Sequence, residues 1–154
     1  MSEVLFYHLE RRNLEDVLPG LLERSVERGW RAVVRVGNAE RLAALDTHLW
    51  TYSEQTFLAH GTAAEGAPKR QPIYLTTEDE NPNGAEVLFL VGGAMNASWE
   101  TPQTKAFARI VLLFDGGDPA LVAGARDTWK SAKSAGHEVT YWKESPSGKF
   151  EKQG

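Results

Sequence analysis

The chain contains no cysteine among its 154 residues. It therefore forms no disulfide, thiolate metal site or cysteine nucleophile, a composition that suits a reducing compartment. Long apolar runs are also missing, since no stretch approaches the roughly 18 residues of a membrane span. The start, Met1-Ser2-Glu3, lacks the basic and apolar regions of a secretory signal. The sequence thus predicts a cytoplasmic protein without membrane contact.

The chain also lacks an excess of positive charge. Its formal net charge is -4 and its isoelectric point is near 5.6. Broad nucleic-acid binding requires the neutralisation of many phosphates, so we expect any contact with DNA to be indirect. With 42% hydrophobic and 25% charged residues, the composition is otherwise ordinary for one globular domain with a single core.

Motifs for nucleotide binding and catalysis are absent as well. No phosphate-binding loop and no Gly-x-Gly-x-x-Gly motif follows a predicted strand, and Gly92-Gly93 is the nearest approach. No serine lies in a Gly-x-Ser-x-Gly elbow, and the four histidines lack metal-ligand spacing. We therefore predict no cofactor, no metal and no catalytic residue.

The 115–118 loop, Asp115-Gly116-Gly117-Asp118, supports an alternative. It follows a predicted strand, where α/β proteins often place metal or active-site carboxylates. A turn residue at Asp115 and a helix cap at Asp118 explain the same two aspartates. A small nucleotide- or metal-dependent enzyme built on this loop stays the alternative to a binding protein.

The spacing of apolar residues alternates between strand and helix along the chain. Short apolar runs predict strands over 4–9, 30–36, 73–76, 87–91, 110–114 and 137–143, and helical spacing predicts helices over 14–26, 39–49, about 101–107 and 118–135. Pro19 fits the first helix if it lies in the first turn. The alternation predicts a mostly parallel sheet with helices on both faces, in one domain over 1–144. The polar segment 145–154 is expected to be a flexible tail.

The helix predicted after Asp118 carries two different faces. Asp118-Pro119 supplies an N-cap and a proline at the first helical position. At roughly 100° per residue, one stripe holds small or apolar residues suited to packing on a sheet: Leu121, Ala125, Thr128, Ala132 and Ala135. A second stripe interleaves three cations with an aromatic and a branched aliphatic side chain: Val122, Arg126, Trp129, Lys130 and Lys133.

The second stripe has the chemistry of a docking face. Its cations suit carboxylates, and Trp129 and Val122 offer apolar surface. It therefore suits an acidic peptide that ends in an apolar residue and a free carboxylate. The alternative is an ordinary solvated helix face with one half-buried tryptophan. The pattern alone leaves both open.

Two stretches together resemble the chi subunit of the bacterial DNA polymerase III holoenzyme, a clamp-loader accessory protein. The first comprises LDTHLWTY at 45–52, FLAHG at 57–61 and PIYL at 72–75, and the second comprises ARDTWK at 125–130 and AGHEVTYW at 135–142. Their order and spacing carry the resemblance, which extends to about Lys143. It implies a three-layer α/β/α Rossmann-like fold that has lost nucleotide binding.

The resemblance also implies a function, that of a non-catalytic replisome adaptor. One face would bind the acidic C-terminal tail of single-stranded-DNA-binding protein, and another would bind the psi subunit, a different clamp-loader subunit or a helicase. By position, Arg126, Trp129, Lys130 and Lys133 match the tail-binding helix, with Val122 where the family can carry a basic residue. Trp50 and Phe57 match the clamp-loader side. An aromatic after an amphipathic helix is also a common core residue, so a core position for these two stays open.

Overall fold

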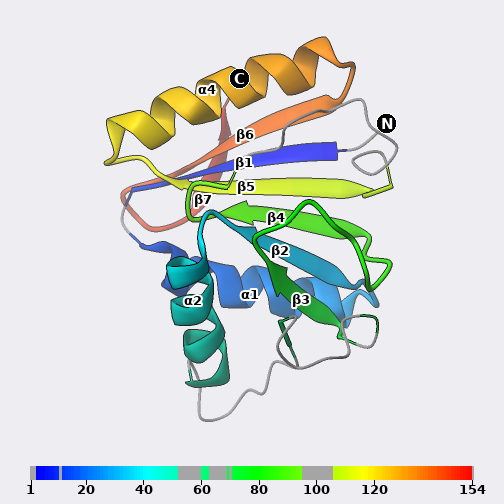
Figure 1. The fold of residues 1–154 in the computed structure, drawn as a ribbon. Coiled ribbons are helices and arrows are strands. Elements are labelled where there is room, and N and C mark those ends of the chain that lie inside the picture. Colours follow the sequence, from blue (N-terminus) through cyan, green and yellow to red (C-terminus); the bar gives the residue numbers. More distant parts are fainter. Residues whose placement is uncertain are drawn as a thin grey trace.

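The computed structural model describes residues 3–10, 12–51, 60–62, 69, 71–94 and 106–153. One sheet runs in the order β3-β2-β4-β5-β1-β6-β7, with helices on both sides (Figure 1). The strands are β1 (Glu3–Leu9), β2 (Ala32–Val36), β3 (Ile73–Thr76), β4 (Val87–Val91), β5 (Arg109–Asp115), β6 (Glu138–Glu144) and β7 (Phe150–Gln153). The described helices are α1 (Leu14–Glu27), α2 (Ala39–Thr51) and α4 (Pro119–Ser134). The predicted single α/β domain is confirmed.

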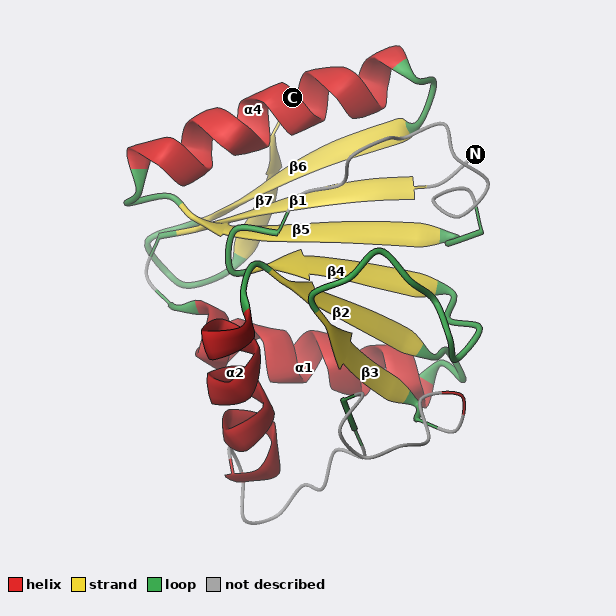
Figure 2. Cartoon of the chain, viewed as in Figure 1, coloured by secondary structure: helices red, strands yellow, loops and turns green. Residues whose placement is uncertain are grey.

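Every pairing among β1 to β6 is parallel, whereas β7 runs antiparallel to β6. All residues of β2 and β4 are buried. β4 is accordingly a continuous apolar run, as expected of a parallel strand buried on both faces, whereas β2 includes the buried Arg35, which pairs with Asp79 at 2.8 Å. The carboxyl ends of the parallel strands meet at one edge of the sheet. There β1 leads into α1 and β5 leads into α4, which lie on different faces (Figure 2).

Two apolar cores separate the layers. One contains Leu18 and Leu22 of α1 and Leu45 and Leu49 of α2, packed against one face of the sheet. The other contains Ala125 and Ala132 of α4, packed against the opposite face with Phe6, Phe107 and Leu112. The sheet is thus the middle of three layers, with α1 and α2 on one side and α4 on the other (Figure 1). The three-layer α/β/α arrangement is confirmed.

Pro19 lies in the second turn of α1 rather than the first, because the helix begins at Leu14. Proline has no backbone N–H, so the carbonyl of Glu15 loses its usual donor four residues on. The Nε2 atom of His48 in α2 lies 2.8 Å from that carbonyl oxygen. His48 thus replaces the missing helical donor and links the two helices.

Part of the segment 145–154, for which the sequence predicts a flexible tail, forms a strand. Phe150 to Gln153 form β7, which pairs with Tyr141 to Glu144. The reason is side-chain packing, since the Phe150 ring makes an edge contact with Tyr7 at 4.9 Å and lies under the Arg12 guanidinium at 5.5 Å. The helix predicted over 101–107 falls mainly on 101–105, outside the described residues. Among the described helices, none is long and apolar enough to span a membrane.

Candidate partner-binding site

The first turn of α4 is fixed by the aspartates of the 115–118 loop. Asp118 is the N-cap, and its Oδ1 accepts from the N–H groups of Ala120 at 3.0 Å and Leu121 at 3.4 Å. The Oδ1 of Asp115 accepts from the N–H of Gly117 at 2.8 Å. Turn and cap roles therefore account for both carboxylates. Within the described ranges, no group of three or more histidine, aspartate or glutamate residues is placed to hold a metal ion.

The small-residue stripe of α4 faces the sheet as predicted. Ala125, Thr128 and Ala132 are buried. Leu121 and Ala135 are half-buried and pack against the same core. The Thr128 hydroxyl donates to the Gly124 carbonyl at 2.9 Å, so its polar atom is satisfied inside the helix. This packing fixes the rotation of α4 and hence the direction of its other faces.

The second stripe predicted from the sequence, which we call the docking stripe, lies along the side of α4. Arg126, Lys130 and Lys133 are exposed, and Val122 and Trp129 are half-buried. The Lys133 ammonium lies 4.6 Å from the centre of the Trp129 ring, within the range of a cation–π contact. The structure thus brings the five predicted residues onto one accessible surface that is cationic outside and apolar toward the core.

A histidine–tyrosine pair lies beside this stripe. His8 Nδ1 is 2.5 Å from the Tyr141 hydroxyl oxygen, and Tyr141 packs in the core that Val122 and Trp129 border. Burial lowers the pKa of His8 below its ordinary value, and Glu10 opposes this. Burial also raises the pKa of Tyr141, against the positive charge of Arg126. The docking stripe therefore borders a polar network within the core.

Sequence reasoning missed this network. His8 is one of the four histidines without metal-ligand spacing, and no motif surrounds it. Its partner Tyr141 lies 133 residues away, and their contact exists because β1 and β6 pair in register. The alternation of side chains along both strands places His8 and Tyr141 on the α4 face of the sheet. This alternation could have indicated the contact from the sequence, but only if the order of the strands in the sheet were already known.

Trp50, predicted for the partner side, lies at the end of α2 and is 46% exposed. Its ring is 4.2 Å from that of His60, which is buried. The His60 Nε2 atom lies 3.0 Å from an Asp46 carboxylate oxygen. Trp50 is therefore not a core residue, and its role at an interface stays a prediction. Phe57 lies outside the described residues.

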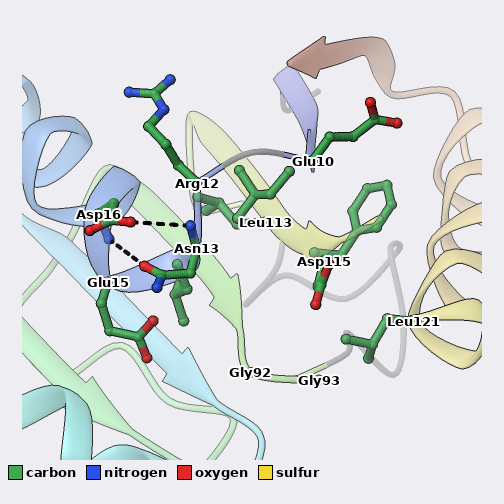
Figure 3. Close-up of a pocket in the computed structure, with 13 residues that line it drawn as sticks. Glu10, Arg12, Asn13, Glu15, Asp16, Gly92, Gly93, Leu113, Asp115 and Leu121 are labelled. Atoms are coloured by element: carbon green, nitrogen blue, oxygen red, sulfur yellow. Dashed lines mark hydrogen bonds between the residues drawn. The ribbon is translucent and has the colours of Figure 1, made fainter. Parts of the chain in front are cut away.

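A cavity of about 410 Å³ opens at the carboxyl ends of β1, β4 and β5, where doubly wound α/β proteins bind nucleotides. Glu10, Glu15, Asp16, Asp115 and Arg12 are its charged lining residues (Figure 3). Four carboxylates against one cation make it acidic, and the cation is bound to Glu144 at 2.7 Å.

The backbone N–H groups of Asn13 and Asp16, at the start of α1 beside this cavity, are also already hydrogen-bonded within the protein. A phosphate binds at a helix N-terminus through free N–H groups. Here the Asn13 side chain accepts from the Asp16 N–H at 3.0 Å, and the Asp16 carboxylate accepts from the Asn13 N–H at 3.4 Å (Figure 3). Gly92 and Gly93 line the same cavity. Its charge and this capping box oppose the nucleotide-dependent alternative.

Comparison with known proteins decides the family. The family model described as "DNA polymerase III chi subunit, HolC" matches residues 1–140. The chain belongs to the DNA polymerase III chi subunit family. A relative from Rickettsia prowazekii (strain Madrid E), named "Probable DNA polymerase III subunit chi", is 29% identical over 117 residues, which cover 75% of this chain and 71% of that protein.

Membership of the chi family assigns the chain to DNA replication and to DNA polymerase III. The family match spans Trp50, the acidic cavity and the whole of α4, and it ends inside β6. Glu144 and β7 lie beyond it. Both names describe a subunit of a polymerase, which agrees with a role inside an assembly.

Proposed function

We propose that this chain is a non-catalytic replisome adaptor that binds the acidic C-terminal tail of single-stranded-DNA-binding protein through α4. The supporting observation is the docking stripe, where three exposed cations share one surface of α4 with the half-buried Val122 and Trp129. This combination of charge and apolar surface suits an acidic peptide that ends in an apolar residue. The chain would thereby reach DNA through that protein and link it to the polymerase.

Two kinds of contact would hold the tail. Arg126 and Lys130 would donate charge-assisted hydrogen bonds to the terminal carboxylate and acidic side chains, each worth about 1.5 to 3 kcal/mol. Trp129 and Val122 offer the apolar surface for the last side chain. Salt screens the exposed charges over roughly 10 Å at 0.1 M. Affinity should therefore fall with added salt without vanishing, because the apolar contact is not screened.

Isothermal titration calorimetry with a synthetic tail peptide tests this. Arg126→Ala should weaken binding by about tenfold or more, and so should removal of the peptide's last residue. Arg24→Ala is the matched control, because Arg24 is an exposed arginine on α1, across the sheet from α4. Undiminished binding by Arg126→Ala, or no binding by the wild type at low salt, would contradict the assignment.

Trp50 supports a second contact, with the psi subunit, another clamp-loader subunit or a helicase. An exposed tryptophan is an unusual surface residue and a frequent energetic centre of interfaces, where its truncation costs about 2 kcal/mol or more. Trp50→Ala should weaken capture of the purified partner while leaving the circular dichroism spectrum unchanged. Loss of the folded spectrum would assign Trp50 to stability and remove the support for this contact.

A further inference from the structure

The face of the sheet opposite α4 carries an aromatic surface near its β7 edge. Tyr7, Trp142 and Phe150 lie there, each half-buried. The Tyr7 and Trp142 rings stack at 6.5 Å with an interplanar angle of 20°. Helix α1 borders this surface, and no described helix lies beyond it over β6 and β7 (Figure 1). Because the three rings are only half-buried, part of this surface is accessible.

Two adjoining hollows make this surface a groove along α1. One of about 490 Å³ lies between α1 and the β6–β7 hairpin, and one of about 160 Å³ lies between α1 and the central strands. They share Tyr7, Leu21 and Arg24. The groove thus follows the flank of α1 from its first turn to Arg28, a length of about 20 Å at 1.5 Å per residue.

Positive charge lines this groove. Its lining contains five cations, Arg12, Arg24, Arg28, Arg109 and Lys149, and one carboxylate, Asp16. Arg12 is paired with Glu144 and Arg109 with Glu3, both at 2.7 Å. Arg24, Arg28 and Lys149 form no ion pair with any residue in the described ranges. A local positive excess in a chain of net charge -4 concentrates attraction for anions in one place.

Aromatic rings hold several of the cations in position. Arg28 and Arg109 lie 4.8 and 5.1 Å from the centre of the Trp30 ring, and Arg12 lies 5.5 Å from that of Phe150. Stacked guanidinium groups lose less freedom when they bind a phosphate in a bidentate manner. The groove therefore combines cations with aromatic rings, as do proteins that bind single-stranded nucleic acids.

We infer that this groove binds single-stranded DNA directly, with Arg24, Arg28 and Lys149 on the phosphates and the half-buried Trp142 and Phe150 against bases. The aromatic rings favour DNA over an acidic peptide, because aromatic side chains stack with bases of any sequence. This contact goes beyond the proposed adaptor role. It also departs from the expectation that any contact with DNA is indirect. That expectation rests on the net charge of -4, which averages over the whole surface and does not reveal a local basic groove.

Fluorescence anisotropy with a labelled oligothymidylate tests the inference on the whole chain. Non-specific affinities lie at about 10⁻⁴ to 10⁻⁶ M, and single-strand binding weakens with salt at a slope of about -0.7 per phosphate contact. With three free cations, the slope expected for the wild type is about -2. The double variant Arg24→Glu with Lys149→Glu should bind about tenfold more weakly and show a shallower slope.

The matched control is Arg126→Glu with Lys130→Glu, which changes the net charge equally on α4. It should leave DNA binding unchanged, while the groove variant should leave tail-peptide binding unchanged, so the two proposals fail separately. Circular dichroism checks that both variants are folded. Absence of oligonucleotide binding at low salt, or equal losses in both double variants, overturns the inference. Groove-dependent binding of oligoglutamate without binding of oligothymidylate also overturns it, in favour of an acidic protein partner.

Discussion

Glu144 is expected to stabilise the loop between β1 and α1, although it lies near the far end of the chain. Its side chain is completely buried. One carboxylate oxygen accepts from the backbone N–H groups of Glu10 and Arg12, both at 3.1 Å, and the other accepts from the Arg12 Nε at 2.7 Å. A single carboxylate thus satisfies two backbone donors and one guanidinium.

Replacement of Glu144 by alanine should cost about 2 to 3 kcal/mol. Two part-buried backbone donors lose their acceptor, each at the lower end of the about 1 to 3 kcal/mol that an unsatisfied donor costs. The Arg12 side chain is 42% exposed, so water can replace its lost partner and the ion pair itself adds little. Since domains have about 5 to 15 kcal/mol of stability, the variant should unfold at a much lower urea concentration.

Urea denaturation followed by far-ultraviolet circular dichroism measures this cost. Lys143→Ala is the neighbouring control, because Lys143 forms an exposed pair with Glu10 at 3.3 Å that is worth at most about 1 kcal/mol. Arg12→Ala should fall between the two, since Glu144 keeps its backbone donors. A loss below about 1 kcal/mol for Glu144→Ala would refute this account of the loop.

Three further outcomes are expected. His48→Ala should cost about 0.5 to 1.5 kcal/mol in urea denaturation and less in a Pro19→Ala background, where the helix regains its own donor. The pKa of His8 lies below 6.5 in the fold, so neutral His8 stabilises the fold above that pH. The stabilisation is lost as the pH falls through the folded pKa, and wild-type stability should decline more steeply there than that of His8→Gln. Millimolar ATP, GTP or a divalent ion should leave the melting temperature unchanged, and a saturable increase would support the enzyme alternative.

Local signals explain why α4 and the central strands were predicted from the sequence. Asp118-Pro119 marks the start of α4, and its periodicity separates the buried stripe from the basic one. The runs 73–76 and 87–91 coincide with β3 and β4, because parallel strands with two buried faces need consecutive apolar residues. These features depend on neighbouring residues, which a single sequence contains.

Features that depend on contacts between distant residues were not predicted. β7 reads as a polar tail, because an edge strand of four residues needs one anchoring ring, Phe150, and leaves the others exposed. Glu144 resembles any surface glutamate until β1 and β6 are placed side by side. The exposure of Trp50 was also left open by the sequence, because the amphipathic pattern of a helix does not tell whether an aromatic residue at its end is buried or exposed.

The arrangement of these surfaces bears on how an adaptor of this fold would work. The docking stripe lies on α4, above one face of the sheet, whereas Trp50 and the basic groove belong to the opposite side, on α2 and beside α1 (Figure 1). The sheet between them is packed on both faces, and the docking stripe and Trp50 lie on different helices. Coupling between sites requires an element with two arrangements that both ligands bias. Occupation of α4 by a tail peptide should therefore leave the affinity at Trp50 unchanged, so that both partners are held at the same time by a rigid connection.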